Sequence, residues 1–77
     1  MTFDKAKRIL PSFVLHCANG ISDLSVLRAR VEGEARKIET LLLDKLAETH
    51  SGSHMTAEIK ALDLKHEQVT RFLEAIR

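Results

Sequence analysis

The sequence predicts a small all-α protein, a helical bundle built on an antiparallel helical hairpin. Two observations support this prediction. Apolar residues recur at intervals of three and four along most of the 77 residues, which is the spacing of amphipathic helices. Turn-forming stretches interrupt the spacing at Asn19-Gly20 and again from His50 to His54. The chain is short enough to form one domain, which we assign to residues 1–77.

The first helix is expected over residues 3–18 and is interrupted by a proline. Its apolar stripe comprises Phe3, Ala6, Leu10, Phe13 and Cys17. Pro11 removes a backbone hydrogen bond and clashes with the carbonyl of Lys7. Two interpretations are compatible with it: a kinked helix over 3–18, or a short turn over 3–9 followed by a helix with Pro11 in its first turn. Asn19 and Gly20 end either version, because both tolerate the left-handed conformation of a helix C-terminus.

The second helix is expected over about residues 23–49. Ser22 is the predicted N-cap, with Asp23 in the first turn. The apolar stripe comprises Leu24, Leu27, Val31, Ala35, Ile38, Leu42 and Leu46. Arg28, Glu32 and Arg36 form an i,i+4 series that we expect on the solvated side. Gly33 marks either a close helix contact or an exposed position where glycine is tolerated.

The third helix is expected over about residues 56–77, with Thr56 as N-cap. Its stripe has the heptad spacing of a coiled coil and comprises Ile59, Leu62, His66, Val69, Leu73 and Ile76. Phe72 lies beside it. Two such helices joined by a short polar loop pack as a hairpin, and the N-terminal helix can cover the groove between them. We predict that both stripes, with Phe72, form the helix interface with a partner.

A second apolar side is present on the third helix. It comprises Ala57, Ala61, Leu64 and Ala75, opposite the heptad stripe. Apolar residues on two sides of one helix indicate contact on both sides. This pattern favours an oligomer or a protein partner over an isolated monomer.

Composition argues against several function classes. The net charge of +1 gives no electrostatic footprint for DNA or an anionic membrane. No run of 18 apolar residues is present, so no membrane span is expected. The single cysteine, Cys17, cannot form an internal disulfide, which favours a cytoplasmic location.

Neither catalytic chemistry, a metal site nor a cofactor is expected. His16 and Cys17 are sequence neighbours, which point about 100° apart on an α-helix and would not face each other. Cys17 is expected in the core. His50 and His54 have the i,i+4 spacing of metal ligands but flank Ser-Gly-Ser, where no helix is expected. His66 is expected to set the register of the seam, with a pH switch as the alternative.

Gly52-Ser53-His54-Met55 has the sequence left when a cleavable His-tag is removed. One interpretation is an engineered seam at residues 51–55, which would separate residues 1–50 from 55–77 as parts of two polypeptides. The other is a chance match in a polar loop. In both cases the helices associate by helix-in-groove packing.

Residues 15–28 resemble part of a helix-turn-helix, with the turn Gly20-Ile21-Ser22 and Val26 as matches. His16 and the long following helix depart from that motif. The resemblance implies DNA binding through residues 11–30 as the alternative function. The hypothesis we favour is a non-enzymatic interaction module: an adaptor, co-chaperone, antitoxin-like or assembly subunit. The expected hairpin is similar in general shape to small co-chaperones of bacterial type III secretion.

Overall fold

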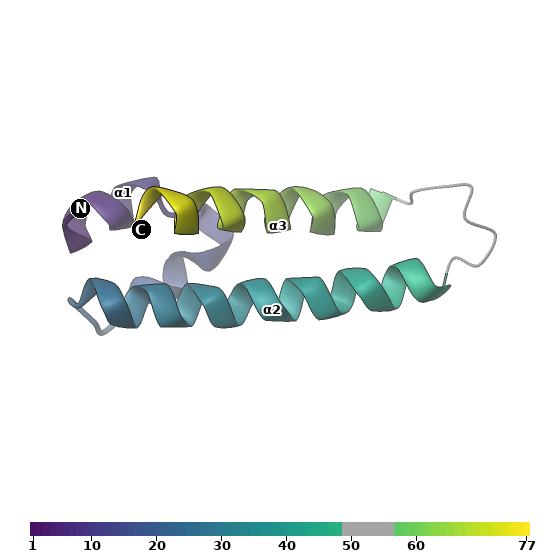
Figure 1. The fold of residues 1–77 in the computed structure, drawn as a ribbon, viewed down its shortest axis with the longest axis horizontal. Helices are drawn as coiled ribbons and strands as arrows, with labels where there is room; N and C mark the ends of the chain where they lie inside the picture. Colours follow the sequence, from purple (N-terminus) through teal and green to yellow (C-terminus); the bar gives the residue numbers. More distant parts are fainter. Residues whose placement is uncertain (49–56) are drawn as a thin grey trace.

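A computed structural model describes residues 1–48 and 57–77 of the chain (Figure 1). In these residues the elements are α1 (Phe3–Ile9), the 3₁₀ helix η1 (Ser12–Ala18), α2 (Leu24–Glu48) and α3 (Ala57–Ala75). Helices α2 and α3 run antiparallel along each other, and α1 and η1 lie at the end of the hairpin that carries the C-terminus. The all-α bundle built on a helical hairpin is therefore confirmed.

The N-terminal segment consists of two short helices rather than one kinked helix. The hydroxyl of Thr2 caps α1 by accepting a hydrogen bond from the Lys5 N–H at 3.3 Å. Leu10 has an extended backbone, φ −65° and ψ 129°, as expected for a residue that precedes proline. Pro11 lies just before η1 rather than inside its first turn. The structure thus agrees with the interpretation of two pieces, although the second piece is a 3₁₀ helix.

The turn into α2 differs from the predicted one at two positions. Gly20 has φ +74°, while Asn19 is extended, so the left-handed conformation falls on the glycine alone. Ser22 is not the cap. Asp23 Oδ1 accepts hydrogen bonds from the Ser25 N–H at 2.9 Å and the Ser25 hydroxyl at 2.8 Å. The Asp23 carbonyl also accepts the first helical hydrogen bond, from Leu27, so Asp23 is the N-cap.

The core is concentrated where α1 and η1 cover the hairpin. It joins four elements, and its buried residues are Ala6, Leu10, Val14, Cys17, Ala18, Leu27, Val31, Ala35, Ile38, Val69, Phe72 and Ile76. Phe72 was predicted to lie beside the seam, yet only 3% of it is exposed. The reason is that α1 and η1 add a second packing surface to α3, which the heptad pattern alone does not include.

Arg28 lies in a different place from the one predicted. Its side chain is partly buried and donates a hydrogen bond from Nη2 to the Ile76 carbonyl at 2.7 Å. The guanidinium therefore contacts the C-terminal end of α3, where a cation is favourable because helix carbonyls there lack helical partners. Gly33 makes no close helix contact, because a Cβ built on it would meet nothing within 4 Å.

In the two ranges that the structure describes, no helix is long and apolar enough to cross a membrane. The Thr56 cap, His50, His54 and the seam at residues 51–55 lie outside the described residues.

Candidate functional site

The residues predicted to bind a partner pack mainly against each other within the hairpin. Seven are buried: Leu27, Val31, Ile38, Ile59, Val69, Phe72 and Ile76. Five are half-buried: Leu24, Leu42, Leu62, His66 and Leu73. Leu46, near the C-terminal end of α2, remains 45% exposed. In the chain as given, most of this surface is therefore already covered by the chain itself.

His66 joins the two long helices. Its Nε2 lies 2.9 Å from Glu39 Oε1 on α2, and its side chain is 30% exposed. A second cross-hairpin ion pair joins Lys45 and Glu58 at 3.4 Å. Polar contacts of this kind fix which residues lie opposite each other in a helix pair.

A largely apolar surface remains exposed along α3. We define the outer face of α3 by Ala57, Ala61, Leu64, Gln68 and Ala75, all exposed. Their spacing of four, three, four and seven residues places them on one side of the helix, which also carries the exposed Arg71. Leu64, 54% exposed, is the largest apolar side chain on this face. Three of the five residues are alanines, which allow another helix to approach closely.

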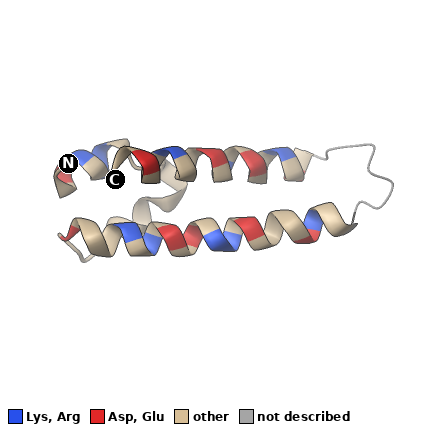
Figure 2. Ribbon diagram, in the orientation of Figure 1, with Lys and Arg blue, Asp and Glu red and all other residues tan. Residues whose placement is uncertain are grey.

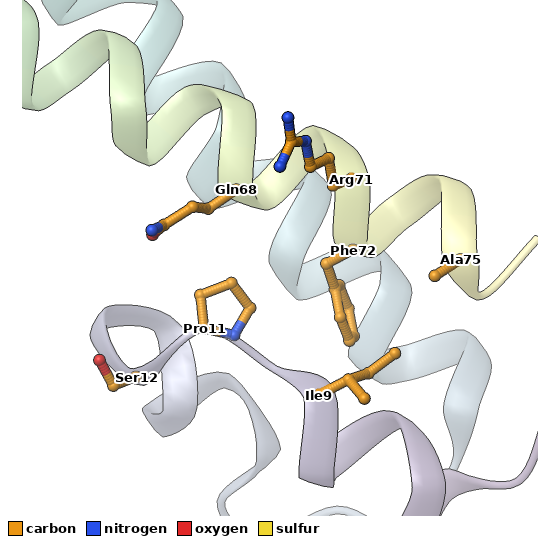
Figure 3. Close-up of a pocket in the computed structure, with 7 residues that line it drawn as sticks. All are labelled: Ile9, Pro11, Ser12, Gln68, Arg71, Phe72 and Ala75. Carbon is orange, nitrogen blue, oxygen red and sulfur yellow. The ribbon is translucent and has the colours of Figure 1, made fainter.

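The outer face of α3 ends in a hollow of about 440 Å³ (Figure 3). Its lining comprises Ile9, Pro11, Ser12, Gln68, Arg71, Phe72 and Ala75. The Phe72 ring points from α3 toward Ile9, while Pro11 lies below the side chain of Gln68. The hollow thus has an apolar interior and a polar rim, an arrangement suited to one large apolar side chain. Ile9 and Pro11 were not predicted as site residues. The sequence does contain one indication of a second contact surface, because Ile9 is apolar and lies off the predicted stripe.

A second cluster of polar side chains lies where η1 packs on α2. Cys17 Sγ is 3.8 Å from His16 Nε2, and the same nitrogen is 3.5 Å from Glu34 Oε1 on α2. The expectation that His16 and Cys17 would not face each other is therefore wrong. The His16 ring is directed at Glu34, and this orientation brings Nε2 within contact distance of the thiol. The sequence could not show that contact because Glu34 lies on another helix.

The surroundings of Cys17 raise the pKa of its thiol. Burial raises its pKa above the ordinary value, and the Glu34 carboxylate raises it further, against the opposite effects of Arg30 and Lys37. Lys37 Nζ lies 3.4 Å from Glu34 Oε1, so part of its charge is balanced there. A nucleophilic cysteine needs a lowered pKa. This environment therefore disfavours nucleophilic catalysis by Cys17. The thiol does lie beside an imidazole and a carboxylate, two groups that can bind a metal ion.

The two arginines within residues 11–30 that DNA binding would use, Arg28 and Arg30, donate hydrogen bonds to backbone carbonyls of this chain. Arg30 Nη1 donates to the Asn19 carbonyl at 3.0 Å, and Arg28 donates to Ile76 as described. The first helix of the helix-turn-helix resemblance is the 3₁₀ helix η1 rather than an α-helix. Basic and acidic residues are interspersed along α2 and α3 instead of forming a basic stripe (Figure 2).

No protein-family model, curated protein or solved structure matches this chain.

Proposed function

We propose that the chain is a non-enzymatic protein–protein interaction module that binds a helix of another protein along the outer face of α3. The observation that supports this best is the continuity between that face and the hollow at Phe72. The roles that fit are those of an adaptor, co-chaperone, antitoxin-like protein or assembly subunit. A cytoplasmic location is part of the proposal, based on the single cysteine.

The geometry of the outer face suits a helix as the bound element. From Ala57 to Ala75 the face extends about 27 Å at 1.5 Å per residue. Alanine side chains let a partner backbone approach, and Leu64 supplies apolar area near the middle. An amphipathic partner helix presents apolar residues at i, i+3, i+4 and i+7. One large residue at its end would enter the hollow that Ile9 and Phe72 line, where the Ile9 side chain is 49% exposed.

DNA binding through residues 11–30 receives less support. Specific recognition needs basic side chains that reach phosphates or base edges. Arg28 and Arg30 are both engaged with backbone carbonyls of this chain.

Paired substitutions of exposed leucines test the proposal. Leu64→Asp places a charge in the outer face of α3, whereas Leu43→Asp changes an α2 leucine that is 66% exposed and lies off this face. Both variants are expected to retain the helical circular dichroism of the wild type, because neither side chain is buried. Affinity capture with quantitative mass spectrometry should recover a partner with wild type and Leu43→Asp but not with Leu64→Asp.

Sedimentation velocity supplies the complementary measurement. Self-association lost only in Leu64→Asp would identify a second copy as the occupant of the outer face, in place of a different protein. A monomer that captures nothing specific, or a partner that Leu64→Asp retains fully, would contradict the proposal.

A further inference from the structure

We propose that His16, Cys17 and Glu34 form a zinc-binding site between η1 and α2. The three side chains belong to two elements that pack together at the hairpin base. Each offers one of the ligand atoms that zinc prefers in proteins: an imidazole nitrogen, a thiolate sulfur and a carboxylate oxygen. This site is separate from the outer face of α3, and it goes beyond the proposed interaction function.

The distances between the ligand atoms agree with tetrahedral coordination. Zinc bonds of about 2.3 Å to sulfur and about 2.0–2.1 Å to nitrogen or oxygen imply ligand separations of about 3.6 Å for S–N and about 3.4 Å for N–O. The observed separations are 3.8 Å for Cys17 Sγ to His16 Nε2 and 3.5 Å for His16 Nε2 to Glu34 Oε1. All three ligand atoms lie within 4.8 Å of one another. The third separation, from Cys17 Sγ to the Glu34 carboxylate, is at most 4.8 Å against about 3.6 Å in a tetrahedral site, so binding draws these two side chains together by up to about 1.2 Å.

The surroundings provide both rigidity and access. Cys17 is buried, Glu34 is half-buried and His16 is exposed, so the ligand set extends from the core to the surface. A hollow of about 280 Å³ adjoins the three residues and is also lined by Gly33, Lys37 and Arg30; the Arg30 guanidinium donates hydrogen bonds to the Cys17 and Asn19 carbonyls. Because Gly33 has no side chain, the approach to Glu34 stays open from that side. Water supplied through the hollow would complete the fourth position, as in zinc sites with three protein ligands.

The charge balance of binding is simple. The Cys17 thiol loses one proton to solvent, and Zn–S, Zn–N and Zn–O bonds form to Cys17, His16 and Glu34. Thiolate and carboxylate together neutralise the dication, so the thiolate that burial and Glu34 disfavour without metal is stabilised by the ion between them. Lys37, which contacts Glu34 at 3.4 Å, must share that carboxylate or move outward. It can do so because its side chain is 74% exposed.

Cobalt(II) is the probe for this site, since it occupies zinc sites and reports its ligands by absorption. Titration of the reduced full chain should give a near-ultraviolet thiolate-to-cobalt band and visible bands of tetrahedral intensity, both abolished by one equivalent of zinc. Cys17→Ser should remove the thiolate band. His16→Gln and Glu34→Gln should weaken cobalt binding at least 10- to 100-fold, since even replacement of groups behind the ligands has that effect.

Two further measurements keep the result specific. The double variant His50→Gln/His54→Gln should retain the thiolate band, which excludes binding by those histidines. Zinc should raise the melting temperature of the wild type and not that of Glu34→Gln, because ligand binding to the folded state stabilises it. A wild type without the thiolate band, or equal affinity in Glu34→Gln, would overturn the zinc site and leave the proposed helix binding untouched.

Discussion

Asp23 shows how one side chain determines where α2 begins. Its carboxylate accepts hydrogen bonds from the hydroxyl and the N–H of Ser25. These bonds, the side-chain one first, hold the pKa of the Asp23 carboxyl below its ordinary value of about 3.9. We predict that Asp23→Ala lowers the free energy of unfolding at neutral pH and that Ser22→Ala does not. Urea denaturation followed by far-ultraviolet circular dichroism measures both.

The pH dependence of the Asp23 effect follows from the direction of that shift. A carboxyl with a lowered pKa in the folded state contributes stability that is present above its unfolded pKa. That contribution is lost as the pH falls through the folded pKa. The difference between wild type and Asp23→Ala should therefore shrink below about pH 4. Equal destabilisation by Ser22→Ala would instead assign the cap to Ser22, as the sequence alone suggested.

The sequence indicates the burial of some residues but not the contacts of others. Val31 and Val69 lie in the middle of stripes with helical spacing, and both are fully buried in the hairpin. The burial of Phe72 was not predicted, since it depends on α1 and η1 folding over α3. The contact of His16 with Cys17 and Glu34 was missed for the same reason. Periodicity reports the faces of one helix, whereas these positions depend on a second element.

Gly33 and Gly20 affect the elements in opposite ways. Gly33 lies inside α2 with open space where a Cβ would be, so Gly33→Ala should stabilise the protein by about 1 kcal/mol through helix propensity. Gly20 has φ +74°, a conformation that strains other residues, so Gly20→Ala should destabilise it. Urea unfolding at neutral pH measures both changes. Loss of stability in Gly33→Ala would show that α2 needs a close approach at this position.

At the scale of elements, boundaries and breaks were predicted better than the type of helix. Gly20 ends the N-terminal segment as predicted, and Pro11 separates α1 from η1, the second of the two interpretations that the sequence left open. The 3₁₀ form of η1 was not foreseen, since a run of seven such residues is long and the segment packs on α2. Arg28 contacts Ile76, 48 residues away. No local pattern indicates a contact over that distance.

At the scale of the whole molecule, the packing of α3 is independent of how the chain joins it to α2. Its buried residues Val69 and Phe72 belong to one core cluster with residues of α1, η1 and α2, and Arg28 contacts its C-terminal end. Residues 1–48 thus form a groove that α3 fills. The sequence allowed two interpretations of residues 51–55, a seam between polypeptides or a native loop. The fold is compatible with both, because helix packing does not require a covalent link.

We predict that the chain cut at a protease site placed between residues 49 and 56 remains an associated pair. The C-terminal fragment should be largely unfolded alone, since most of the stability of a protein helix comes from tertiary packing of its apolar face, and should regain helicity on mixing with the N-terminal fragment. Circular dichroism and native mass spectrometry measure this association.

The melting temperature of the cut protein should rise with concentration, because association is now part of folding. That of the uncut chain, run as the control, should change less. Fragments that separate at micromolar concentration would show that the link, rather than the groove, holds α3 in place.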